Sequence, residues 1–321
     1  MTTPSHPTLH PTLEEARTLL EAATGLLERA ITGGKTLTDG GKRIDDHQVA
    51  TERIAYAATE AVAAHEVIIA AEELRNEGRS SPALELTAVG AVGQLVKGLR
   101  GRLSDSADDL GLGDAAVEAA FPTEIRGLLR RANSESLCRE IGTHILATRG
   151  VNDFPLDEMH EQVREQVREF AANEVIPHAE HIHRKDDLVP EAFITKMAEL
   201  GFFGLSVPEE YGGVEMGNLA MILTTEELSR ASLAAAGSLI TRPEILAKAL
   251  LGGGTDQQKS EWLPKLASGE IMVGISVTEP DIGSNVAGAK CRAERTTIDG
   301  VPGWIINGPK SWCTFAGRAN I

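Results

Sequence analysis

The chain has 321 residues, 42% of them hydrophobic, and a formal net charge of −16. This length predicts two or three soluble globular domains, and the negative charge argues against binding to nucleic-acid phosphates. The three cysteines are far apart in the sequence, so we expect no disulfide framework and a reducing, cytoplasmic location. No apolar run reaches the roughly 20 residues that cross a membrane, so we expect no membrane partner.

The first half of the chain is predicted to be helical. Residues 1–12, rich in Pro, Thr and His, are expected to form a disordered tail, and residues 13–150 a helical extension. Apolar residues recur at helical spacing from Leu13 to Ile31, and Gly33 and Gly34 are expected to stop this helix. Further helices are expected over residues 45–75, 82–103 and 124–147.

A second helical region is predicted over residues 151–270. Apolar residues repeat at three and four positions from Leu156 to Phe170, which predicts an amphipathic helix that ends at Pro177. Further helices are expected over residues 190–200, 218–251 and 256–266.

The periodicity changes after Gly269, where residues 271–321 read as the start of an antiparallel β domain. Strands are expected over residues 271–278, 291–297 and 304–307, with turns at Gly300 and at Asn307-Gly308. Three strands leave unpaired edges, so we expect the chain to stop before this domain is complete. The expected fold class is mostly α with a partial antiparallel β domain.

The segment Ile275–Asn285 combines an expected strand with a turn rich in small and polar residues. Pro280 fixes its own φ angle, and Gly283 permits a positive φ and close approach of a ligand. Thr278 and Ser284 add hydroxyl groups beside main-chain N–H groups, and such a donor cluster suits a phosphate or the carbonyl groups of a flavin. The alternative is a purely structural hairpin.

Two motifs at this spacing resemble the acyl-CoA dehydrogenase family. They read Thr278-Glu-Pro-x-x-Gly-Ser284 and Asn307-Gly-x-Lys-x-Trp-x-Thr314. The resemblance extends back to about residue 153 through three segments: Phe202–Gly213, Glu226–Arg230 and Gln257–Gly269. It implies a helical acyl-CoA dehydrogenase domain followed by the start of a β-barrel domain.

The resemblance also implies a chemistry, the removal of an α-proton and a β-hydride from an acyl-CoA thioester. FAD is the expected cofactor, and its flavin N5 accepts the hydride. The expected cofactor-binding residues are Ile275, Ser276, Val277, Thr278, Gly283, Ser284, Trp312, Cys313 and Thr314. In the family the Trp and Thr flank the flavin from the strand after the first motif, and Ser284 also approaches the CoA moiety.

The resemblance places the catalytic base outside this sequence. The family takes a glutamate from a C-terminal helical domain, so we expect the base beyond Ile321 and no turnover by these 321 residues alone. Glu279 is expected to be part of the loop's scaffold rather than the base. Asn285 and Cys313 depart from the family's usual Asp and Ile.

The helical extension bears on the substrate. With Asp45-Asp46-His47-Gln48 opening a long helix, it resembles a branch of the family, the methylsuccinyl-CoA dehydrogenases of the ethylmalonyl-CoA pathway. Their substrate carries a free carboxylate, and we name Arg242 as its candidate partner. The alternative is a surface arginine or one paired with Glu244. Arg230 is expected to be structural.

Two other functions remain open at this point. One is a general short- or branched-chain acyl-CoA dehydrogenase, and the other is a non-catalytic flavin-binding or helical interaction protein. The resemblance further implies electron-transfer flavoprotein as the electron acceptor and a homo-oligomeric full-length protein. His178, His181 and His183 lie in a charged segment, and we expect no metal site there.

Overall fold

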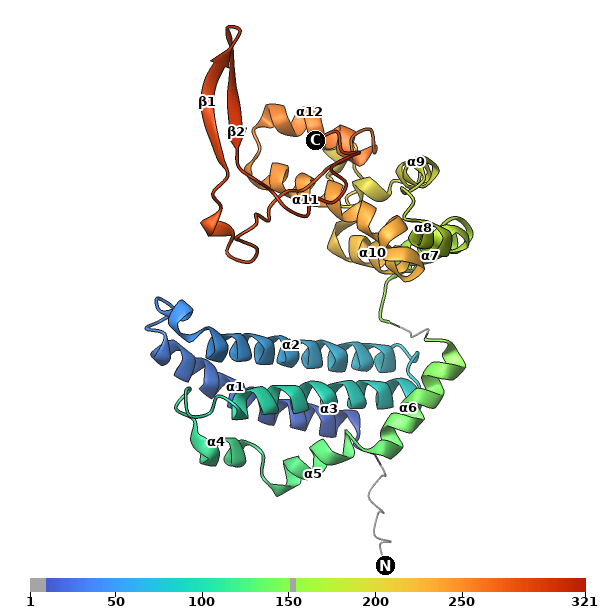
Figure 1. The fold of residues 1–321 in the computed structure, drawn as a ribbon. Helices are drawn as coiled ribbons and strands as arrows, with labels where there is room; N and C mark the ends of the chain where they lie inside the picture. The colour runs from blue at the N-terminus through green and yellow to red at the C-terminus, as the bar shows by residue number, and fades with distance from the viewer. Residues whose placement is uncertain (1–9, 151–153) are drawn as a thin grey trace, which may run out of the picture. The chain divides into compact units, whose positions relative to one another are not determined.

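The computed structural model describes residues 10–150 and 154–321, which form two compact units divided between Pro155 and Leu156. Figure 1 shows both units, and each is described by itself here. The described residues are mostly helical and contain one two-stranded antiparallel sheet. This confirms the expected fold class.

The N-terminal unit is a helical bundle built on three long helices. Its helices are α1 (Leu13–Leu37), α2 (Gln48–Asn76), α3 (Pro82–Ser104), α4 (Gly113–Ala120), α5 (Thr123–Arg131) and α6 (Glu135–Thr148), with a 3-10 turn at Ile44–His47. Figure 1 shows α1, α2 and α3 running lengthwise beside one another.

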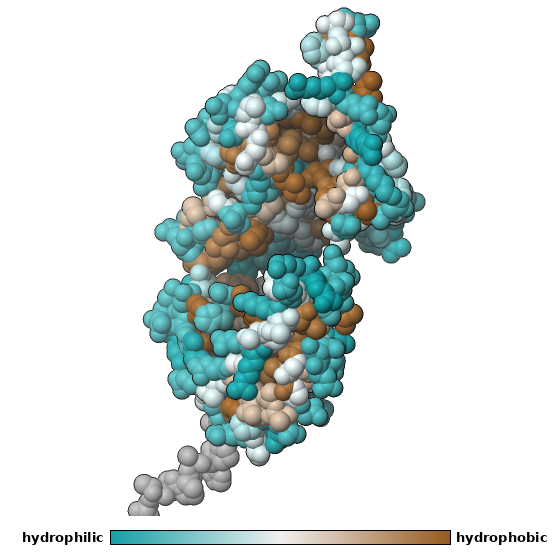
Figure 2. All heavy atoms as spheres, turned by 90° about the vertical axis from the view of Figure 1, so that its left-hand side faces the viewer, coloured by the Kyte–Doolittle hydropathy of each residue, from teal (hydrophilic) through white to brown (hydrophobic). Residues whose placement is uncertain are grey.

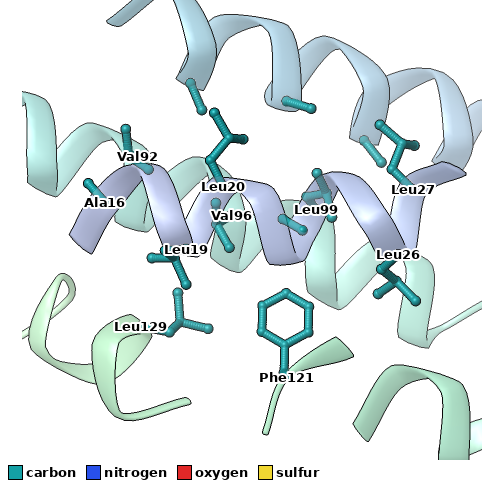
Figure 3. Packing of buried hydrophobic residues seen from close by; sticks show 14 of the residues in the cluster. Ala16, Leu19, Leu20, Leu26, Leu27, Val92, Val96, Leu99, Phe121 and Leu129 are labelled. Atoms are coloured by element: carbon teal, nitrogen blue, oxygen red, sulfur yellow. The ribbon is translucent and has the colours of Figure 1, made fainter. Parts of the chain in front are cut away.

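The core of this unit lies where α1 and α3 face α2 and the shorter helices. Leu19 and Leu26 of α1 pack with Leu99 of α3 and with Phe121, and all four are almost fully buried (Figure 3). Burying each side chain of this size contributes about 1.5–3 kcal/mol. The shared apolar cluster holds α1, α3 and the Phe121 segment together.

The first helix begins at Leu13, as predicted, and ends later than a stop at Gly33 predicts. The Oγ1 of Thr12 accepts a hydrogen bond from the Glu15 N–H at 3.2 Å, and the Glu15 carboxylate accepts from the Thr12 N–H at 2.8 Å. This capping box fixes the start of α1. His10 is buried and pairs with Glu140 at 3.1 Å. The rest of the expected tail, residues 1–9, lies outside the described residues.

Two further helix boundaries correct the prediction. Helix α1 runs through Gly33 to Leu37, because Gly33 serves close packing: an added Cβ would lie 2.0 Å from the Leu110 carbonyl oxygen. The single helix expected over residues 124–147 is broken between Arg131 and Glu135, where the Ser134 side chain caps α6.

The sequence was expected to contain no apolar run long enough to cross a membrane, but one helical segment meets that criterion. By length and composition, the helical segment Ile44–Asn76 is apolar enough to cross a membrane. Within it, Ala57, Ala61 and Ala64 are buried in the shared core, while Tyr56 and Val62 are exposed. This is weak evidence, because core helices of soluble proteins meet the same criteria.

The C-terminal unit begins with helices and ends with a hairpin. Its helices are α7 (Glu158–Phe170), α8 (Ile176–Lys185), α9 (Glu191–Glu199), α10 (Gly217–Ser232), α11 (Ser238–Gly253) and α12 (Asp256–Ala267). Single π-helical turns, Ala171–Val175 and Leu233–Gly237, join α7 to α8 and α10 to α11, and 3-10 turns lie at Phe202–Gly204, Glu209–Tyr211 and Val286–Gly288.

Pro177 does not end the helix in which it was expected to act as a stop. It lies in the first turn of α8, directly after the π-helical turn. A proline is tolerated in the first turn of a helix because its missing N–H would have no intrahelical acceptor there.

Strands β1 (Arg292–Ile298) and β2 (Val301–Asn307) form the antiparallel hairpin. The turn between them consists of Asp299 and Gly300, both at positive φ (51° and 81°), which is the geometry of a type I′ turn. The prediction of a turn at Gly300 is confirmed.

The predicted Asn307-Gly308 turn is wrong. Asn307 is the last residue of β2 and pairs with Arg292. Gly308 has φ 144°, and an added Cβ would lie 2.7 Å from the Cα of Cys291. This glycine is therefore required for a close approach of two main chains rather than for a hairpin turn.

The strand expected over residues 271–278 is present only as extended chain. Ile271, Met272 and Val273 are buried, as expected of a core segment. The Met272 carbonyl accepts from the Asn320 N–H at 2.8 Å, and the Gly274 N–H donates to Ile321 at 2.8 Å. These isolated bonds do not form a ladder.

Candidate functional site

The first motif folds as a tight turn. The main chains of Glu279 and Ile282 exchange hydrogen bonds of 3.1 Å in both directions, and Pro280 occupies the second position of the turn. Proline favours this position because its ring fixes the φ angle that the turn requires. The Thr-Glu-Pro sequence thus produces a sharp reversal directly after the extended segment that ends at Thr278.

Glu279 is the buried centre of this turn, with only 4% of its surface exposed. Its carboxylate accepts hydrogen bonds from the Lys290 N–H at 2.8 Å, the Cys291 N–H at 2.9 Å and the Lys310 Nζ at 2.9 Å. The bonds from Lys290, Lys310 and Cys291 lower the pKa of Glu279 to about 2. A carboxylate held this way is a poor general base, in agreement with its expected role in the scaffold.

The two motifs lie beside each other. The Ser311 N–H donates to the Thr278 carbonyl at 2.9 Å. Farther along, the Cys313 sulfur lies 3.6 Å from the position that a Cβ on Gly274 would take. The structure therefore brings Ile275–Thr278 together with Ser311–Cys313, two segments that the sequence assigns to one cofactor site.

Main-chain donors are left without acceptors on both segments. Among residues 10–150 and 154–321, no protein group accepts a hydrogen bond from the N–H groups of residues 275–278 or 312–314. Ser276, Thr278 and Thr314 add hydroxyl groups along the same stretches, and none is fully buried. Polar groups in such a position bind water or a ligand. The donor set fits the polar edge of a flavin ring.

Gly283 and Ser284 follow the turn and are exposed. Gly283 does not adopt a positive φ, which corrects that part of the expectation, and an added Cβ would meet nothing within 4 Å. The space around it is open, so a ligand could approach the main chain here. No hydrogen bond in the described parts of the chain joins Ser284 to Trp312 or Thr314.

Trp312 lies in a loop after β2, not on a strand as the resemblance implies. Its φ is 59°, in the left-handed region that a bulky residue rarely adopts. Its side chain is 89% exposed. Cys313 is half-buried and Thr314 exposed. Between residues 271–278 and the main chain of residues 311–314, the described chain has a single hydrogen bond, from the Ser311 N–H to the Thr278 carbonyl, and no strand forms.

Arg242 lies on the half-buried face of α11, and its guanidinium donates to the Ser238 carbonyl one turn earlier. Burial lowers the pKa of Arg242, and the nearby Cys313 thiol acts in the opposite direction. Arg242 forms no ion pair with any described residue, and Glu244 instead lies 2.9 Å from Lys248. The alternative of a Glu244-paired arginine is therefore wrong, and Arg242 lacks an acidic partner within the described chain.

Arg230 belongs to a separate cluster of arginines around one buried carboxylate. Glu227, whose side chain is 3% exposed, lies 2.9 Å from Arg230, 2.5 Å from Arg168 and 3.3 Å from Arg164. Burial raises the pKa of Glu227, but the bonds from Arg168 and Arg230 outweigh it and lower the pKa overall. This cluster ties α7 to α10, as expected of a structural arginine. Sequence reasoning did not find Arg164 and Arg168.

Apolar surface gathers in a hollow on one face of the C-terminal unit (Figure 2). Exposed large apolar residues of this unit include Leu233, Ile245, Val277 and Trp312. A separate groove of about 750 Å³ lies in the N-terminal unit, between α1 and the segment Asp108–Leu112. None of the motif residues lines this groove, so we do not assign the candidate site to it. The candidate site is identified by the geometry of the two motifs.

The comparisons with known proteins identify a family for the helical part of the C-terminal unit. Residues 157–270 match the family model described as acyl-CoA dehydrogenase, N-terminal domain. The chain is 36% identical over 317 residues to (2S)-methylsuccinyl-CoA dehydrogenase of Cereibacter sphaeroides, covering 96% of this chain and 56% of that protein. An alignment of this length must include the helical unit before Pro155.

A second relative matches a shorter part. The chain is 39% identical over 166 residues to the mitochondrial 2-methylacyl-CoA dehydrogenase of Solanum tuberosum, covering 51% of this chain and 39% of that protein. A glutaryl-coenzyme A dehydrogenase structure matches 52% of this chain and 42% of its own, at 32% identity and a TM-score of 0.46. The chain thus spans about half the length of the relatives it matches.

Proposed function

We propose, on the premise that residues 157–270 form an acyl-CoA dehydrogenase N-terminal domain, that the protein dehydrogenates an acyl-CoA thioester with FAD. The observation that carries the proposal is the pairing of Thr278 with Ser311, which sets two segments of unpartnered main-chain donors side by side. The two relatives described above are named as dehydrogenases of acyl-CoA substrates, which supports the proposal.

The residues of this chain bind and orient rather than react. FAD, when bound, accepts the β-hydrogen of the acyl group as a hydride. The N–H groups of residues 275–278 and 312–314 would supply hydrogen bonds to the cofactor. Ser284, which follows Gly283 and its open surroundings, would approach the CoA moiety. Glu279 does not act as the base, because its pKa of about 2 leaves it too weak to take an α-proton.

For the substrate we propose methylsuccinyl-CoA, converted to mesaconyl-CoA. Two observations support this choice over a general acyl-CoA. The similarity to the Cereibacter sphaeroides enzyme extends through the helical unit. Arg242 also offers a half-buried guanidinium without an acidic partner among the described residues, which suits the free carboxylate of a dicarboxylic acyl group.

A branched acyl-CoA without a second carboxylate is the competing substrate. The 39% identity to a 2-methylacyl-CoA dehydrogenase supports it. In that case Arg242 would remain bonded to Ser238 and would not contact the acyl group. For electron transfer we propose an electron-transfer flavoprotein as acceptor, and for the full-length protein a cytoplasmic homo-oligomer.

The test uses the full-length protein, purified with FAD under anaerobic conditions. Methylsuccinyl-CoA, isobutyryl-CoA and butyryl-CoA are added separately, and loss of the flavin's visible absorption is recorded. Rapid bleaching by methylsuccinyl-CoA alone supports both parts of the proposal. Bleaching by the neutral esters alone supports the dehydrogenase but rejects the dicarboxylic substrate.

A further inference from the structure

Lys310 joins the two motifs, and only its bond to Glu279 has been described so far. Its Nζ donates to the Glu279 carboxylate at 2.9 Å and to the Val277 carbonyl oxygen at 3.1 Å. Its side chain is only 27% exposed, and that of Glu279 is 3% exposed. Ion pairs that are shielded from water and share further hydrogen bonds hold their geometry better than exposed ones.

The bond to Val277 has a consequence for the next residue. The Val277–Thr278 peptide is planar and trans, so its C=O and its N–H point in opposite directions. Lys310 holds the carbonyl, and the Thr278 N–H therefore points to the other side of the chain. No described residue accepts a hydrogen bond from that N–H.

The following peptide is held as well. The Thr278 carbonyl accepts from the Ser311 N–H at 2.9 Å, and the Glu279 N–H donates to Ile282 at 3.1 Å. Two successive peptide planes are thus fixed, one by the side chain of Lys310 and one by the main chain of its neighbour Ser311. Of these two anchors, only Lys310 can be removed by substitution without changing the main chain.

We propose that Lys310 is a positioning residue that, through its bonds to the Val277 carbonyl and to Glu279, presents the Thr278 N–H to the flavin. This inference rests on the proposed function, because it assumes a flavin at the two segments. It adds a residue that touches neither cofactor nor substrate and acts through the direction of one peptide plane.

The test compares three variants of the full-length protein. Lys310→Met removes both bonds, and Lys310→Arg retains a cation that can reach the same oxygens. Lys290→Met is the matched control, because it removes a lysine whose side chain pairs with Asp281 of the same turn at 3.0 Å, and both partners of that pair are exposed. The readouts are the FAD dissociation constant and, at saturating FAD, the visible spectrum and midpoint potential of the flavin.

Lys310→Met is expected to weaken FAD binding by about tenfold, the effect of losing a charge-assisted hydrogen bond, and to displace the flavin spectrum and potential even at saturation. Lys310→Arg should restore most of both, and Lys290→Met should match the wild type. A Lys310→Met protein with wild-type affinity, spectrum and potential would overturn the inference. So would a loss of affinity with an unchanged spectrum and potential, since that pattern describes a merely structural lysine.

Two further outcomes are assigned in advance. If Lys310→Met does not fold, Glu279→Gln, which keeps the size of the side chain but weakens its hold on Lys310, carries the same comparison and the same expected displacement. If the wild-type protein takes up no FAD at all, the proposed function fails and this inference fails with it. If the wild type binds FAD and Lys310→Met binds it equally well, with the same spectrum and potential, only this inference fails.

Discussion

The carboxylate of Glu279 lies 2.9 Å from the Nζ of Lys310, a residue 31 positions later in the chain. This pair joins the Thr-Glu-Pro turn to the segment that carries Trp312, so the two motifs are parts of one structure. The energetic and chemical consequences of this arrangement can be measured.

The first prediction concerns pH. Because the folded-state pKa of Glu279 is lowered from 4.5 to about 2, its contribution to stability is complete above the usual value and is lost as the pH falls from there through about 2. We expect the difference in melting temperature between wild type and Glu279→Gln to be constant at neutral pH and to shrink as the pH falls below 4.5. A difference that stays constant down to a pH of about 2 would contradict the assigned role of the Glu279 carboxylate.

The second prediction concerns Arg242. Arg242→Met should raise the KM for methylsuccinyl-CoA by roughly ten- to a hundredfold, the range for a lost charged hydrogen-bond pair, and leave the KM for isobutyryl-CoA unchanged. Steady-state kinetics of the full-length enzyme with both substrates measure this. Equal effects on the two esters would remove Arg242 from the carboxylate site.

The third prediction concerns the buried carboxylate of Glu227. Glu227→Gln removes the negative charge that three arginines share and should destabilise the protein by about 3 kcal/mol, as when a buried ion pair loses one of its charges. The control is Glu180→Gln, which breaks the exposed pair with Arg184 and should cost less than about 1 kcal/mol. Denaturant unfolding measures both, and similar losses in the two variants would show that the cluster stabilises the protein no more than an exposed ion pair does.

The fourth prediction compares two glycines of one helix. Gly33→Ala places a methyl group 2.0 Å from the Leu110 carbonyl oxygen and should destabilise the protein by about 2 kcal/mol or more through overpacking. Gly25→Ala meets nothing within 4 Å and should stabilise α1 by up to about 1 kcal/mol. Thermal unfolding of both variants decides this, and a harmless Gly33→Ala would mean that α1 and the Leu110 segment are not in contact.

The helices were the most predictable part of the fold. The apolar periodicity of Leu13–Ile31 and of the residues around Ala57 and Ala61 reflects burial on one face, and burial is what the structure shows there. The breaks were harder to predict. Gly33 looks like a helix stop, but its partner Leu110 is distant in sequence, and only the folded chain shows that a close contact requires the glycine.

Contacts between residues distant in sequence also explain the errors in the β region and in the candidate site. Asp299-Gly300 and Asn307-Gly308 are both favoured by hairpin turns, and pairing along the strands, which the sequence does not display, selects the first. The expected strand at Trp312 depends on neighbours that residues 271–278 do not supply. Lys310 is part of the second motif, but its proposed positioning role depends on a hydrogen bond to the Val277 carbonyl that the spacing of the motifs does not predict.

Reduction of enzyme-bound FAD tests the central claim most directly. The full-length protein, loaded with FAD and mixed anaerobically with methylsuccinyl-CoA, should lose its visible flavin absorption within one turnover and release an unsaturated acyl-CoA when an electron acceptor is added. A protein that binds no FAD, or whose FAD stays oxidised with methylsuccinyl-CoA and with every neutral acyl-CoA tried, would contradict the account.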